Sequence, residues 1–218
     1  MSRSSKPSRR RRSVIVVAGE GDYDRKVLQH LVPALHPGEC PEVRMLRKPI
    51  RLARAQFKLH PRLQEIKNHA AGLASKDEAE LAGIVIHADL DGVADDSYAT
   101  LRHRLRKEMK SVFKDTPSAL ALAAFEIEGW LMLFPDAFPK VRPRWKMREE
   151  DCRRDLAKLA KAKEHLMKNL GQPTYRESDA PKIMEEAVKG GHVSHTPTGN
   201  NRSYADFAKD IADWRKAT

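Results

Sequence analysis

Three short apolar runs, each bounded by turn-forming or charged residues, most strongly constrain the fold of this chain. They lie at residues 14–18 (VIVVA), 83–88 (GIVIHA) and 120–125 (LALAAF). Their length and composition predict buried strands, and residues 43–46 predict a further short one. Segments with helical spacing of apolar residues separate these runs. Strands that alternate with helices in this way are typical of crossover units and a mostly parallel sheet.

The rest of the chain is predicted to be helical, apart from its beginning. Between and after the strands, apolar spacing predicts helices at 23–35, 52–75 (interrupted or restarted at Pro61), 98–113 and 126–134. After about residue 149 no further strand is expected, and helices are predicted at 150–170, 181–188 and 204–215. Residues 1–13 are expected to be a disordered basic arm. We therefore predict an α/β core at 14–140, with helices on both faces of the sheet, and a helical extension at 141–218.

Composition narrows the class of protein. The 218 residues are 40% hydrophobic and contain no apolar run of the length that a membrane span requires. The first twelve residues lack the apolar segment of a secretory signal, so we expect a cytoplasmic protein without a membrane partner. Two cysteines cannot supply a disulfide framework. A net charge of +11 and a pI near 9.7 favour a polyanionic partner.

Acidic residues follow three of the predicted strands. The carboxyl ends of neighbouring parallel strands meet at one edge of a sheet, where functional residues gather. Carboxylates brought that close repel one another unless a cation compensates, and oxygen ligands with few His or Cys nearby suit Mg²⁺ or Mn²⁺. Such ions activate water and stabilise phosphoryl transfer. The acids concerned are Glu20, Asp22 and Asp24, then Asp89, Asp91, Asp95 and Asp96, then Glu126 and Glu128.

A structural role is the alternative for some of these acids. Asp22, Asp95 and Asp96 stand where helices are expected to begin, and carboxylates are favoured there as N-caps and by the helix dipole. The combination of Glu20 with Asp89 and Asp91 is less easily explained in this way. An acidic metal site inside a basic protein is what a polyanionic substrate would require.

Several motifs, in order, resemble the Toprim family over residues 14–134. The segment VIVVAGEGDYD (14–24) resembles the Toprim opening, a strand that ends in Glu before an acidic helix start. The segment VIHADLDG (85–92) resembles its second motif, a strand that ends in Asp-x-Asp. The segment FEIEGWLMLFPD (125–136) resembles the Ile-Glu-x-Trp-Leu stretch of small stand-alone bacterial Toprim proteins of unknown function, related to the Toprim half of OLD nucleases. Two later segments, 179–182 and 203–207, also resemble that subgroup.

The resemblance implies a Toprim-like fold and a role for each matching residue. Glu20 would be a metal ligand or general base, and Asp89 and Asp91 would bind metal. Glu128 would complete the site or hold a second ion, and Lys182 would stabilise charge on the phosphate. Similar proteins are associated with bacterial antiphage defence, some beside an ATPase partner.

We therefore predict a nuclease that depends on Mg²⁺ or Mn²⁺ and cleaves phosphodiester bonds in DNA or RNA. The nucleic acid would be held by basic side chains, in a salt-sensitive and weakly sequence-selective way. The sequence leaves the oligomeric state open, with a homodimer as one option. The predicted contacts are Arg9, Arg10, Arg11 and Arg12 in the arm and Arg102 and Arg106 on the helix at 98–113.

Two other functions compete with the nuclease. The chain could be a non-catalytic subunit that binds nucleic acid or assembles a complex on a Toprim fold. The segment DLDGVADDS (89–97) also resembles the first motif of haloacid-dehalogenase phosphatases, in which the first Asp is a nucleophile. That motif normally opens its domain, whereas here a strand and GEGDYD precede it, and the later phosphatase motifs are not apparent.

Overall fold

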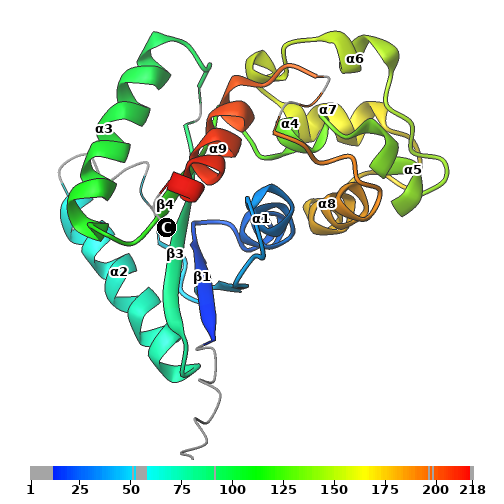
Figure 1. Ribbon diagram of the computed structural model, residues 1–218. Coiled ribbons are helices and arrows are strands. Elements are labelled where there is room, and N and C mark those ends of the chain that lie inside the picture. Colours follow the sequence, from blue (N-terminus) through cyan, green and yellow to red (C-terminus); the bar gives the residue numbers. More distant parts are fainter. Residues whose placement is uncertain are drawn as a thin grey trace, which may run out of the picture.

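The chain folds around a parallel sheet of four strands in the order β2-β1-β3-β4 (Figure 1). A computed structural model describes residues 12–50, 52, 58–90, 92–195, 197 and 199–216. The strands are β1 (Ser13–Ala18), β2 (Glu42–Met45), β3 (Glu80–Asp89) and β4 (Ser118–Ala123). All pairings are parallel, and the prediction of four strands in a parallel sheet is confirmed. Of the predicted arm, residues 1–11 lie outside the described residues, and Ser13 already belongs to β1.

Both faces of the sheet are buried, because alternate residues of each strand enter different cores. In β1, Val14 and Val16 pack into one core, whereas Ile15 and Val17 pack into the other. The period of two in side-chain direction produces this division. It explains why the strands read as continuous apolar runs instead of alternating with polar residues.

Helices cover each face, as predicted. On one side lie α2 (Leu59–Lys76) and α3 (Asp96–Phe113), and on the other α1 (Asp22–Leu35) with α8 (Ala180–Lys189) and α9 (Arg202–Ala212) (Figure 1). The helix α8 packs against α1, and α9 packs against β4. The fold is thus α/β with a parallel sheet and helices on both faces, consistent with a Toprim-like arrangement. No helix in the described part of the chain is long and apolar enough to cross a membrane.

Between β4 and α8 the helices are shorter than the sequence predicts. They are α4 (Glu128–Leu131), α5 (Phe138–Val141), α6 (Glu149–Arg153) and α7 (Ala162–Asn169), with 3-10 turns η1 (Pro135–Ala137), η2 (Leu156–Lys158) and η3 (Glu177–Asp179), and a further turn, η4 (Asp213–Lys216), follows α9. The prediction of one helix at 150–170 was wrong. The chain leaves the helix after α6 because Asp155 forms a bridge with Asn200, whose carbonyl accepts a hydrogen bond from the Leu156 amide at 2.8 Å.

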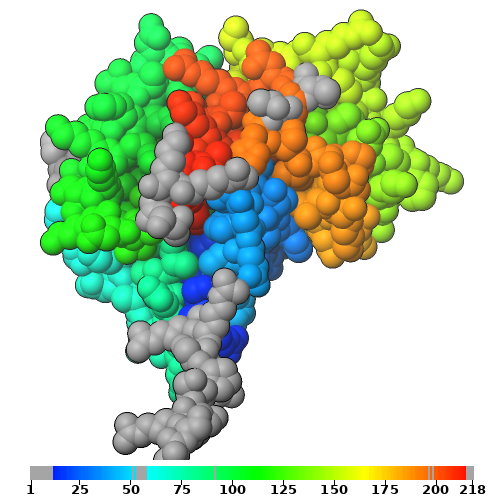
Figure 2. All heavy atoms as spheres, viewed as in Figure 1, coloured from blue at the N-terminus to red at the C-terminus, as the bar shows by residue number. Residues whose placement is uncertain are grey.

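Aromatic packing joins the extension to the core. Trp130 stacks on Phe207 with ring centroids 5.4 Å apart, and its indole donates a 2.8 Å hydrogen bond to the hydroxyl of Ser203. Tyr204 adds an edge contact with the Trp130 ring. Figure 2 shows the extension, in yellow and orange, as a lobe against α1 in blue. One hydrophobic core therefore runs across residue 140, the predicted boundary between core and extension.

The outer edge of β4 is closed by charged side chains. Arg102 donates to the carbonyl of Leu120 at 2.9 Å, and Arg106 donates to that of Ser118 at 2.6 Å. Asp210 of α9 accepts from the Leu120 amide at 3.0 Å and pairs with Arg102 at 2.7 Å. These contacts occupy backbone groups that an edge strand would otherwise offer to another chain.

Replacement of Arg102 by leucine is expected to lower the free energy of unfolding by about 2–4 kcal/mol. The side chain is only 11% exposed, and its loss leaves Asp210 short of a partner and removes a donor from the carbonyls of Leu120 and Asp206. Urea denaturation measures the change. Lys107→Leu, on the exposed side of the same helix, is the control and should alter stability by less than about 0.5 kcal/mol. Equal losses in both variants would show that Arg102 does not hold this edge.

Candidate functional site

Acidic side chains line a cleft at the carboxyl ends of β1, β3 and β4. The parallel register pairs Ala18 with Ile86 and Asp89 with Ala123, so the three strands end side by side. The cleft has a volume of about 460 Å³. Its charged lining residues are Asp22, Asp24, Asp89, Glu126, Glu128, Glu177 and the cation Lys163. The predicted convergence of acids from three strand ends therefore occurs.

At the base of the cleft, Asp24, His87 and Asp89 form a compact cluster. Each offers one ligand atom, and these atoms lie within 4.8 Å of one another. The Nδ1 atom of His87 lies 3.8 Å from Oδ2 of Asp24, and its Nε2 atom lies 3.3 Å from Oδ1 of Asp89. His87 is fully buried. The approach to Asp89 is an ion-pair contact that is not aligned as a hydrogen bond, so both ring nitrogens and Oδ1 of Asp89 are buried polar atoms without a hydrogen-bond partner.

Local structure explains how these residues meet. Val85, His87 and Asp89 alternate toward the same face of β3, the face covered by α1. Asp24 stands in the first turn of α1, where the helix dipole favours a carboxylate. Gly19 lies against the histidine, and a Cβ atom there would be 2.8 Å from Cβ of His87. The glycine after β1 is therefore required by close packing.

The electrostatics of the cluster follow from burial and opposite charge. Burial raises the pKa of Asp24, against the lowering effect of the neighbouring His87. For His87 burial is the largest influence and lowers the pKa, but the contact with Asp89 and the charges of Asp24, Asp89 and Glu20 raise it to about 9. Two acids thus hold a proton on the imidazole.

A second layer of polar residues lies beside the cluster. Glu128 is buried, and this burial raises the pKa of its carboxyl group to about 7. The hydroxyl of Tyr175 donates to Oε1 of Glu128 at 3.1 Å. The ammonium of Lys163 pairs with Glu177 at 2.5 Å and lies 3.9 Å from Glu126. The cleft therefore contains a carboxyl group, that of Glu128, which can exchange a proton near neutral pH. It also contains the ammonium group of Lys163, which the ion pair with Glu177 holds in place.

The structure brings some of the predicted site residues together and separates others. Asp89 belongs to the cluster, and Glu128 lines the same cleft. Glu20, two residues after β1, is near enough for its charge to act on His87. Asp91 lies outside the described residues. Lys182 is exposed on α8, and it is not among the residues that line the cleft.

Other predictions need correction or fall outside the described residues. Arg102 is not free to bind phosphate, because its guanidinium is enclosed by Asp206, Asp210 and the backbone of β4. Arg106 is partly used in the same way. The exposed Arg12 pairs with Glu42, and Arg9, Arg10 and Arg11 lie outside the described residues. Asp95 is the N-cap of α3, and its carboxylate accepts a hydrogen bond from the Ser97 amide at 2.8 Å. This is the helix-capping role that the sequence offers as the alternative to metal binding.

Sequence reasoning missed several cleft residues. The expectation of few histidines near the acids is wrong, because His87 lies between two carboxylates. Its position carries a signal, since a histidine two residues before Asp89 in a strand must share its face. The sequence places Asp24 among the candidate acids but does not single it out as a ligand. Lys163 and Tyr175 had no sequence signal, since the extension places them.

The cluster fits a divalent cation. Two carboxylates and an imidazole are a common donor set for such ions, and both ring nitrogens of His87 and Oδ1 of Asp89 are buried without hydrogen-bond partners. The lining acids outnumber the lining cation. Because the imidazole must be deprotonated to act as a ligand, affinity for the ion is expected to rise with pH.

Comparisons of the chain with protein-family models, with curated proteins and with solved structures found no match.

In protein kept free of divalent ions by a chelator, stability should fall as the pH rises from about 6.5 to about 9. The pKa of His87 is raised from 6.5 to about 9, so its contribution is complete below the lower value and is lost toward the upper one. At about 1.4 kcal/mol per pKa unit, the loss approaches about 3 kcal/mol. Urea denaturation across this pH range measures it.

The variant His87→Asn provides the control. It removes the titrating group, so its free energy of unfolding should change little over the same pH interval. Any change that remains comes from other ionisable groups, which the native chain shares. Parallel stability curves for the two proteins would contradict a proton held between the two carboxylates.

Proposed function

We propose that the protein is a divalent-metal-dependent nuclease that hydrolyses phosphodiester bonds in DNA or RNA. The observation that carries this proposal is the Asp24–His87–Asp89 cluster at the base of an acidic cleft, in which both ring nitrogens of His87 and Oδ1 of Asp89 are buried without hydrogen-bond partners. An acidic cleft in a chain of net charge +11 suits a substrate whose phosphates are drawn to the basic surface. Without a cation, such a cleft would repel those same phosphates.

The donor set narrows the choice of ion. Carboxylate oxygens suit Mg²⁺ and Mn²⁺, whereas an imidazole nitrogen suits transition metals better than Mg²⁺. The presence of His87 beside Asp24 and Asp89 therefore favours Mn²⁺ over Mg²⁺. Glu20 is a further candidate ligand or base through its resemblance to the Toprim glutamate.

The chain's own residues would divide the remaining work. A divalent ion bound at the cluster would supply Lewis acidity and lower the pKa of bound water. Asp24, His87 and Asp89 would hold it. Glu128, with a pKa near 7, can accept or release a proton at neutral pH, and the Tyr175 hydroxyl fixes the orientation of its carboxyl group. Lys163 places a positive charge on the wall of the cleft, where a phosphate would otherwise meet only acids.

The cellular role rests on the Toprim resemblance. Proteins of that kind are associated with antiphage defence, some beside an ATPase partner, and a homodimer is one option for the oligomeric state. The contacts in the cleft neither require nor oppose such partners.

The variant Asp89→Asn is expected to reduce cleavage of plasmid DNA or total RNA by at least about 100-fold with Mn²⁺ or Mg²⁺. The substitution removes a charge from the cluster with little change in shape. Asp24→Asn should behave in the same way. The rate of product formation is measured on gels, with nucleic-acid binding measured in parallel to show that the substrate is still held.

Asp22→Asn is the matched control. It changes a carboxylate in the same first turn of α1, but this side chain is more than half exposed and pairs with Lys26. It should keep activity within about threefold, a change of less than about 1 kcal/mol in the barrier. Binding without cleavage under any metal would favour a non-catalytic nucleic-acid-binding subunit. Phosphate release from phosphomonoesters that is lost in Asp89→Asn but not in Glu20→Ala would favour the phosphatase.

A further inference from the structure

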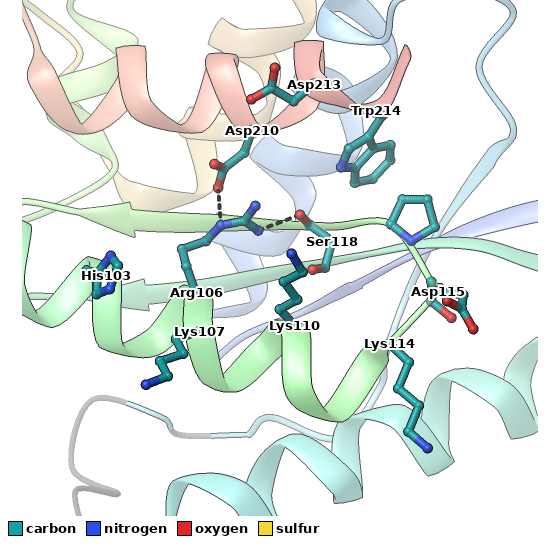
Figure 3. A pocket seen from close by; sticks show the side chains of 12 residues that line it. His103, Arg106, Lys107, Lys110, Lys114, Asp115, Ser118, Asp210, Asp213 and Trp214 are labelled. Atoms are coloured by element: carbon teal, nitrogen blue, oxygen red, sulfur yellow. Dashed lines mark hydrogen bonds and ion pairs between the residues drawn. The ribbon is translucent and has the colours of Figure 1, made fainter. Parts of the chain in front are cut away.

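A second cavity, of basic character, lies far from the acidic cleft. It is found between the last part of α3 and the segment of α9 and η4, beside the start of β4 (Figure 3). Its volume is about 820 Å³. Its lining contains four cations, Arg106, Lys107, Lys110 and Lys114, together with His103 and three acids, Asp115, Asp210 and Asp213.

Lys107 and Lys110 lie on one side of α3, and Lys114 continues this row as the residue that caps the helix. A spacing of three residues places the first two on the same helix face, whereas Lys114 has a φ of 53° and is not helical. All three are exposed, and none pairs with an acid among the described residues. By contrast, the neighbouring Arg102 and Arg106 pair with Asp210. Like charges three residues apart destabilise a helix, so Lys107 and Lys110 retain a repulsion that a bound polyanion would relieve.

The wall of the cavity adds donors to this row. Arg106 binds the carbonyl of Ser118 and contacts Asp210, which fixes its guanidinium at the cavity (Figure 3). On the η4 side, Trp214 is 8% exposed, and its indole N–H is buried without an acceptor. A buried donor of this kind gains from an oxygen that reaches it. The cavity therefore presents a small excess of cations over acids and an unused donor, but no exposed aromatic face on which a base could stack.

The two sites lie at opposite ends of β4. The acidic cleft adjoins Ala123, where the strand ends, and the basic cavity adjoins Ser118, where it begins. Five residue steps at about 3.3 Å each separate them by about 16 Å. A single small molecule would not reach both sites, whereas a nucleic-acid strand of several nucleotides would.

We infer that the basic cavity and the row Lys107, Lys110 and Lys114 bind the phosphate backbone of a nucleic acid several nucleotides away from the acidic cleft. This inference rests on the proposed function, which it extends by assigning the contact surface. The contact reads no bases, because it offers charge and donors without a stacking platform. It replaces Arg102 as the phosphate contact on α3.

The test is the salt dependence of binding to a 20-nucleotide single strand, in EDTA so that no cleavage occurs. Each phosphate contact contributes about 0.7 to the slope of log K against log salt for single strands. The variant K107Q/K110Q/K114Q should therefore lose about 2 from this slope. Its affinity at 0.1 M NaCl should fall by up to about 100-fold, and the two proteins should converge near 1 M.

The control variant K158Q/K161Q/K168Q makes the same change of charge at exposed lysines that pair with Asp155 or Glu164. It should keep the native slope to within about 0.5. Thermal unfolding confirms that each variant is folded. If the triple variant does not fold, the single variants K107Q, K110Q and K114Q should each lose about 0.7.

The outcomes separate this inference from the proposed function. Native protein that binds no nucleic acid in EDTA and cleaves none with Mn²⁺ or Mg²⁺ overturns both. Native protein that binds, with equal slopes for the two triple variants, overturns the inference alone. A tripolyphosphate probe tests for a free-phosphate site. If it binds as tightly as the oligonucleotide and depends on the same lysines, the cavity takes a small polyphosphate and the backbone assignment is wrong.

Discussion

The parallel pairing of β1 with β3 is the constraint on which the candidate site depends. It brings the turn after Ala18 beside the end of β3 and presses Gly19 against His87. Burial of both sheet faces leaves only the strand ends for polar groups, and α1 adds Asp24 from its first turn. The result is an imidazole enclosed between two carboxylates, an arrangement that is stable only while a proton or a metal ion lies among them.

Charge is distributed along the sheet in a way that the net charge conceals. Acids gather at the carboxyl end, around Asp89 and Glu128, and exposed lysines gather near the amino end of β4. A polyanion would therefore be attracted by one end of the molecule and would need a cation to approach the other. The proposed nuclease uses both ends on one substrate. The distance between the two sites therefore sets how many nucleotides lie between the phosphate contact and the acidic cleft.

Tertiary contacts give the basic residues of α3 two different roles. Arg102 and Arg106 point toward β4 and α9, where they occupy carbonyls of an edge strand and pair with Asp210. Lys107 and Lys110, on the same helix, remain exposed and without acidic partners among the described residues. The planar guanidinium suits several fixed acceptors, and the ammonium suits a mobile phosphate contact.

Local patterns in the sequence predict the strands, most of the helices and the edge of the sheet at which acids meet, because period and burial are properties that neighbouring residues share. The same patterns place Asp89 and Glu128 at that edge. They do not predict that His87 and Asp24 complete the cluster, that Lys163 and Tyr175 reach it from the extension, or that the helix expected at 150–170 breaks. Each of these depends on contacts between residues distant in the chain, and the free energy of such contacts is not encoded in any local spacing.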